Sequence, residues 1–149
     1  MRMRVMAVSA VLTGLLASAW AAPAPGDGAP AKAKVSFVGL KDGDVVPPTF
    51  HVKFGLTGMT PRPAGEDIFD RKTGHHHLLI DTGPIPKGDV IPFDDTHKHF
   101  GKGQTETDVT LSPGPHTLTL QFADGAHSSY GPALATTIHV TVDANKAGK

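Results

Sequence analysis

The sequence predicts an all-β protein, an antiparallel sandwich of the immunoglobulin or fibronectin-III type with about seven short strands. Several segments alternate apolar and polar residues, which is typical of half-buried strands. No segment carries the 3.6-residue apolar stripe of an amphipathic helix. The 17 glycines and 13 prolines, against 6% aromatic residues, indicate many turns between short elements. The same pattern also allows a small barrel.

Each strand is expected from its own alternation and from the turn residues that end it. The first, 35–38, stops at the Lys41-Asp42-Gly43 turn. In the second, 49–56, Phe50, Val52, Phe54 and Leu56 share one face. The following stretch, 57–74, is polar and rich in proline and glycine, which predicts a long loop without a core element.

Four further strands follow the loop, each with apolar residues at every second position on one face. The turn Ser112-Pro113-Gly114 separates the second of them from the third. In chain order they are 75–81 with Leu78 and Ile80 inward, 105–111 with Val109 and Leu111, 116–122 with Leu118, Leu120 and Phe122, and 135–142 with Ile138, Val140 and Val142.

The N-terminus predicts a secretory signal peptide over residues 1–21. Arg2 and Arg4 form a basic start, an apolar stretch follows, and Ala19-Trp20-Ala21 offers the small-residue pattern of a cleavage site. The apolar stretch is too short for a membrane span. We therefore expect a periplasmic or secreted protein with a flexible leader at 22–34, a sandwich domain at 35–142 and a polar tail at 143–149.

Composition excludes several classes of function. Fourteen basic residues balance fourteen acidic ones, which argues against nucleic acids and anionic membranes as partners. The absence of cysteine excludes disulfides, thiolate metal sites and a cysteine nucleophile. The nucleophile elbow, the P-loop and the H-E-x-x-H motif are all missing from the sequence, so it disfavours the common hydrolases.

The nine histidines are the unusual part of the composition. His75, His76 and His77 are consecutive within a predicted strand, where residues two apart share a face about 6.6–6.8 Å from each other. His75 and His77 therefore project together, whereas His76 aligns with Leu78 and Ile80. Such a pair of imidazoles can bind one metal ion. Alternatively, His76 is a core histidine bonded to the backbone and its neighbours cap a loop.

A second H-x-H pair, His97 and His99, precedes a glycine-rich turn. Together the two pairs form the all-nitrogen donor set that copper(II) and zinc accept. His127, in the turn between the last two strands, joins the site if that turn lies at the same end of the sandwich. Asp94, Asp95 and Glu106 are candidate acceptors for the imidazole N–H groups, or ligands themselves. The alternative is that the two pairs are unrelated, exposed loop histidines. For His51, His116 and His139, on polar strand faces, we expect exposure to solvent.

Three longer motifs carry a resemblance to a known family: GHHHLLID at 74–81, HxHFGxGQTE at 97–106 and PGPHTLTL at 113–120. With them the sequence resembles an uncharacterised family of secreted bacterial domains, known only as a domain of unknown function. It departs from that family after His127, where the family tends to carry a further histidine and two prolines and this chain has Tyr130, Gly131 and a single Pro132. The resemblance implies a small β-rich periplasmic domain and supplies no activity.

The sequence thus predicts an exported metal-binding sandwich whose candidate ligands are His75, His77, His97, His99 and His127. We expect copper or zinc, a role in metal handling rather than catalysis, and binding that weakens as pH falls through about 6.5. Two other functions fit the same residues. One is a structural module with hydrogen-bonded histidines and an envelope protein as partner. The other is a metalloenzyme with an open coordination position.

Overall fold

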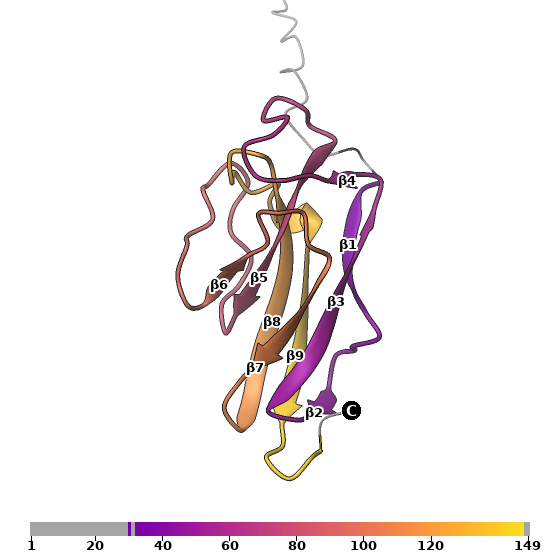
Figure 1. Ribbon diagram of the computed structural model, residues 1–149, viewed down its shortest axis with the longest axis vertical. Coiled ribbons are helices and arrows are strands. Elements are labelled where there is room, and N and C mark those ends of the chain that lie inside the picture. The colour runs from indigo at the N-terminus through magenta and orange to yellow at the C-terminus, as the bar shows by residue number, and fades with distance from the viewer. Residues whose placement is uncertain (1–29, 31, 148–149) are drawn as a thin grey trace, which may run out of the picture.

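A computed structural model describes residue 30 and residues 32–147, and the predicted signal peptide, with most of the predicted leader, lies outside the described residues. Within them the chain forms short strands and a single 3-10 turn, arranged as two packed sheets (Figure 1). The elements are β1 (Lys34–Val38), β2 (Asp44–Val46), β3 (Thr49–Thr57), β4 (Thr60–Pro61), β5 (Thr73–Ile80), β6 (His97–His99), β7 (Glu106–Thr110), β8 (Gly114–Ala123), η1 (Pro132–Leu134) and β9 (Ala135–Val142). The prediction of an all-β sandwich is confirmed.

The two sheets differ in size. The smaller has the order β1-β3-β7 and is antiparallel throughout. The larger has the order β2-β9-β8-β5-β4, with β6 also paired to β5. Its short edge strands β2 and β4 run parallel to their neighbours, so this sheet is mixed. No ladder joins the two sheets among the described residues, so the fold is a sandwich and not a small barrel.

The core lies between the sheets and follows from the alternation in the sequence. Phe50, Val52 and Phe54 of β3 are buried against apolar residues of the larger sheet. Each such side chain stabilises the fold by about 1.5–3 kcal/mol relative to exposure. From β8 and β9 the core includes Leu118, Leu120, Phe122, Ile138, Val140 and Val142.

The outer face of the larger sheet is also covered over β5 and the second half of β8, whereas β9 exposes that face to solvent. All eight residues of β5 are buried, although antiparallel sheets commonly expose one face to water. The chain between β5 and β6 lies over this face, and Gln121 of β8 anchors it. The Gln121 side chain accepts a 2.8 Å hydrogen bond from the Ile85 N–H and donates a 2.8 Å bond to the Ile85 carbonyl. A second buried layer therefore forms outside the sandwich core.

The prediction of a long loop at 57–74 is wrong in three places. β3 includes Thr57, Thr60–Pro61 form β4, and β5 begins at Thr73 rather than at His75. β2 and β6 were also not predicted as strands. Strands of two or three residues are too short to show alternation, and here they are fixed by pairing with β5 and β9. In the described part of the chain, no helix is both long and apolar enough to cross a membrane.

Candidate metal centre

Four histidines gather on the covered outer face of the larger sheet. His75 and His77 project there together because they are two residues apart on β5. The register of the β5–β6 ladder places His99 directly opposite His77. His127 comes from the turn that follows β8, and its Nε2 atom lies 3.1 Å from Nε2 of His99. Three separate segments thus deliver the four rings, which we call the histidine cluster.

Three rings of the histidine cluster have ligand atoms spaced closely enough to hold one ion, and the fourth ring, His127, lies beside them. Ligand atoms of His75, His77 and His99 all lie within 4.8 Å of one another. Five of the six ring-centre separations among the four rings are 4.7–5.0 Å, and the sixth, His77 to His127, is 6.1 Å. With metal–nitrogen bonds of about 2.0–2.1 Å, the ring centres of tetrahedral ligands lie about 5 Å apart.

Burial keeps the inner rings of the cluster neutral. His75 is 0% and His77 is 1% exposed, and none of their four ring nitrogens has a hydrogen-bond partner. Burial, assisted by the neighbouring histidines, lowers the pKa of His75 to about 3 and that of His77 to about 2. Burial and His127 likewise lower the pKa of His99. His75 and His77 therefore offer free lone pairs at neutral pH, as a metal ion requires.

One side of the cluster opens to a pocket. His77, His99 and His127 line it together with Val90, Ile91, Pro92 and Phe93, whereas His75 lies deeper. Phe93 is 84% exposed and meets the His99 ring edge-on at a centre distance of 5.8 Å. The pocket gives an ion a path to the rings from solvent.

Gly101 is the glycine of the HxHFG motif, and its contacts explain why this position has no side chain. A Cβ atom at this position would overlap the His99 ring, with Nε2 of His99 only 2.6 Å away. The missing side chain thus leaves the space that the His99 imidazole occupies within the cluster.

His97 does not join the other four predicted ligands. Its ring Nδ1 lies 2.8 Å from Oδ1 of Asp94, and the same carboxylate oxygen accepts the backbone N–H bonds of Thr96 and His97. This carboxylate-capped turn holds the ring away from the cluster. Asp95 and Glu106 are exposed and are not part of the cluster either.

His76 faces the sandwich core, as its alignment with Leu78 and Ile80 predicts. Its ring packs between Phe54 and Phe122 at centre distances of 5.2 and 5.0 Å. Neither ring nitrogen makes a hydrogen bond, so the predicted backbone bond of a core histidine is absent. Burial lowers the pKa of His76 to about 4. A polar contact with the Gln104 backbone acts in the opposite direction, although it does not have hydrogen-bond geometry.

Each of the three histidines on polar strand faces lies beside a carboxylate. His51 pairs with Asp108, His116 with Asp81 and His139 with Asp42, at 2.7–2.9 Å. Both ring nitrogens of His116 face acceptors, Asp81 and the Ser112 carbonyl. Desolvation alone would lower the pKa of His116, but these contacts outweigh it and raise the pKa above 6.5. For Asp81, desolvation is outweighed by bonds from Thr117 and His116, which lower its pKa below 3.8.

The His116→Gln variant is expected to show how this pair depends on pH. Because the pKa of His116 is raised by folding, its contribution to the free energy of unfolding is fully present below pH 6.5. That contribution is lost as pH rises through the pKa of His116 in the folded protein. The lowered Asp81 pKa gives stability that is lost as pH falls through its value, below 3.8. Because Asp81 is half exposed, the contribution is less than about 1 kcal/mol. Urea unfolding should show the largest deficit of the variant near pH 5 and almost none above pH 9; an equal deficit at both pH values would contradict this reading.

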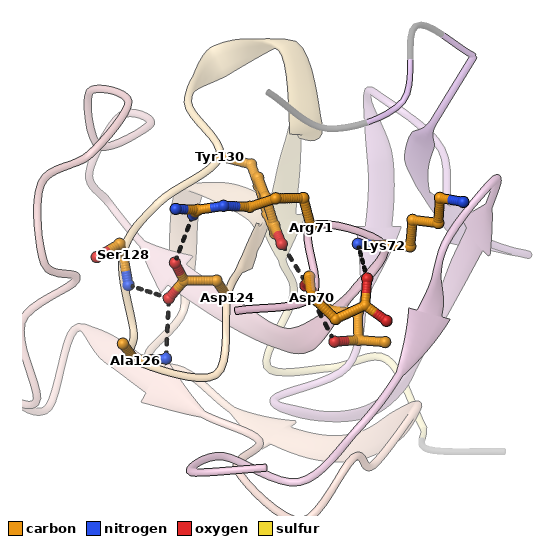
Figure 2. Close-up of polar contacts among 8 residues, drawn as sticks. Asp70, Arg71, Lys72, Asp124, Ala126, Ser128 and Tyr130 are labelled. Atoms are coloured by element: carbon orange, nitrogen blue, oxygen red, sulfur yellow. Dashed lines mark hydrogen bonds and ion pairs between the residues drawn. The ribbon is translucent and has the colours of Figure 1, made fainter. Parts of the chain in front are cut away.

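Sequence reasoning missed the residues that hold the His127 turn. Figure 2 shows Asp124 at its centre, with Arg71 on one side and the backbone of Ala126 and Ser128 on the other. An aspartate followed by a glycine and a short polar turn is a known signal for side-chain capping of backbone N–H groups. No sequence signal links Arg71 to this turn, because the two meet only through the fold.

Fold and site together define a small β-sandwich protein with a histidine cluster in which His75, His77 and His99 can hold a metal ion. The chain belongs to the family described as "Domain of unknown function (DUF4399)", which matches residues 52–143. This confirms the resemblance to an uncharacterised family. No curated protein and no solved structure matches the chain.

Proposed function

We propose that this protein is exported to the periplasm or secreted, and that it binds one zinc or copper ion through His75, His77, His99 and His127. The observation that carries the proposal is the convergence of these four rings, with the ring nitrogens of the two most buried ones unpaired. An unpaired buried polar group costs about 1–3 kcal/mol, and a bound ion removes that cost.

The spacing of the rings bears on the choice of metal. A square-planar copper(II) centre would place two pairs of opposite rings about 6.3 Å apart and the others about 4.5 Å apart. Only one separation, 6.1 Å, approaches the larger value, and the other five are nearly equal. This pattern is closer to the tetrahedral geometry of zinc, and we propose zinc ahead of copper(II).

Metal handling fits the site better than catalysis. The four histidines supply the full set of ligands that a closed zinc site uses, whereas catalytic zinc sites keep one position for water or substrate. The pocket beside the rings is lined by four apolar residues besides histidines, and none of its lining residues carries a carboxylate or a hydroxyl. Within this pocket, no carboxylate is therefore placed to act as a general base on a hydrolytic water.

Calorimetric titration of the mature protein, without an affinity tag, with Zn(II) and Cu(II) tests the proposal. We expect one ion per chain with a dissociation constant below 1 mM, corresponding to more than about 4 kcal/mol of binding free energy. The His77→Ala and His99→Ala variants should each bind at least about 10- to 100-fold more weakly. His139→Ala, which removes an exposed histidine paired with Asp42, is the matched control and should bind like the wild type.

Two outcomes would overturn the proposal. One is no binding by the wild type. The other is equal binding by the wild type and both cluster variants, which would place the ion elsewhere. Cell fractionation of the full-length chain tests the export half, and a precursor that stays uncleaved in the cytoplasm would contradict it.

A further inference from the structure

His127 occupies an unusual position for a histidine. Its φ angle is 67°, in the left-handed region that residues with a side chain seldom adopt. Such backbone strain persists only where the surrounding structure enforces it. The ring that this conformation directs lies 3.1 Å from Nε2 of His99, in the histidine cluster.

The backbone of His127 is fixed on both sides. Its N–H donates a 3.0 Å hydrogen bond to the Asp124 carbonyl, and its own carbonyl accepts a 3.1 Å bond from the Ile91 N–H. The neighbouring residue Ser128 forms a bridge with Val90. The turn is therefore tied to the loop that covers the larger sheet, and it has little freedom to move the ring.

The side chain of Asp124 closes this turn from within. One carboxylate oxygen, Oδ1, accepts 2.9 Å hydrogen bonds from the N–H groups of Ala126 and Ser128, which flank His127. The other oxygen, Oδ2, faces the guanidinium of Arg71 at 3.3 Å (Figure 2). Asp124 is 4% exposed, so the hydrogen bonds and Arg71 must together compensate for its desolvation.

Arg71 connects the turn to the start of β5. Two residues further along, the Thr73 carbonyl accepts a 2.8 Å hydrogen bond from the Tyr130 hydroxyl, which comes from the far side of the same turn. Figure 2 shows the Tyr130 side chain beside Arg71. The turn is thus held at two points on the segment that leads into His75 and His77.

We infer that Asp124, supported by Arg71, is a positioning residue of the metal centre: it locks the turn that presents His127 as the fourth ligand. The inference rests on the proposed function, because it assigns a role in binding the same ion. When this lock is open, the three other histidines form an incomplete site.

A double-mutant cycle with Zn(II) as the probe tests the inference. His127→Asn removes the imidazole and keeps a residue that tolerates the left-handed conformation. We expect Asp124→Ala and His127→Asn each to weaken Zn(II) binding by about 10- to 100-fold. The double variant should be no weaker than His127→Asn, because Asp124 acts only through that ring. Asp124→Asn keeps the Oδ1 acceptor and loses the ion pair, so it should retain most of the affinity.

Three controls separate positioning from a general loss of structure. Asp143→Ala removes a carboxylate that caps a turn at the other end of the sandwich, where Oδ1 accepts the Asn145 N–H, and it should bind Zn(II) like the wild type. Far-UV circular dichroism of each variant should match the wild type. In the Cu(II) form, electron paramagnetic resonance should show one coordinating nitrogen fewer in both Asp124→Ala and His127→Asn.

The outcomes distinguish this inference from the proposed function. If the wild type binds no Zn(II), the proposed function fails. If the wild type binds but His127→Asn binds equally well, or if the effects of Asp124→Ala and His127→Asn multiply in the double variant, the positioning role is overturned while the proposed function stands.

Discussion

The His77→Leu variant is expected to be more stable than the wild type without metal and less stable than it with metal. In the metal-free protein the His77 ring is 1% exposed with both nitrogens unpaired, which costs about 1–3 kcal/mol. Leucine has a similar volume and carries no polar atom. We therefore expect the free energy of unfolding of the metal-free variant to rise by about 1–2 kcal/mol.

Metal reverses that order. At 100 times its dissociation constant, an ion stabilises the wild type by about 2.7 kcal/mol, whereas the variant with one ligand removed gains little. Urea unfolding with EDTA and with excess Zn(II) measures both differences. If the histidines instead form a hydrogen-bonded scaffold, the variant is destabilised by the same amount in both conditions, and that result would contradict our account.

The Gly101→Ala variant is expected to lose metal affinity although every ligand is still present. The added Cβ overlaps the His99 ring, which is the movable end of a side chain, so the ring shifts and the backbone does not need to. We expect Zn(II) binding to weaken by about 10- to 100-fold. The free energy of unfolding should change by less than about 1.5 kcal/mol. Calorimetric titration and urea unfolding of the same sample measure the two effects.

Gly83→Ala is the matched control for this variant. A Cβ at Gly83 meets no atom within 4 Å, so the substitution should leave Zn(II) affinity unchanged. Its stability should be unchanged or slightly higher, because alanine restricts the unfolded chain more than glycine does. Unchanged Zn(II) binding by Gly101→Ala would mean that His99 is not a ligand in its observed position.

The strands that the sequence predicts well are those with one face in the sandwich core. The expected strand at 135–142 coincides with β9, and the strand expected at 49–56 differs from β3 by one residue. Alternation is readable there because burial dictates it at every second position. β2 and β4 have too few residues for a pattern, and they exist because β9 and β5 offer free edges to pair with.

The sequence predicts only the part of the site that lies on a single strand. The two-residue spacing of His75 and His77 places both rings on one face whatever surrounds the strand. The sequence does not distinguish His99 from His97, because the difference lies in the Asp94 carboxylate that binds the His97 ring. Nor does it reveal that Arg71 and Asp124, which are 53 residues apart, meet beside the His127 turn.

The covered outer face of the larger sheet is the feature that sequence patterns represent worst. Continuous burial of β5 removes the polar alternation that usually marks a strand with one solvated face. The covering chain between β5 and β6 has no regular pattern, and Gln121 anchors it through contacts 36 residues apart in the sequence. The histidine cluster depends on this cover, because it keeps His75 and His77 away from water.

The position of the bound ion tests the account most directly. Anomalous diffraction at the zinc edge from crystals of the Zn(II)-loaded protein should show one strong peak per chain. We expect that peak about 2.0–2.1 Å from a ring nitrogen of each of His75, His77, His99 and His127. A peak bound by other residues, such as His97 and Asp94, with the cluster rings arranged as before and no density among them, would contradict it.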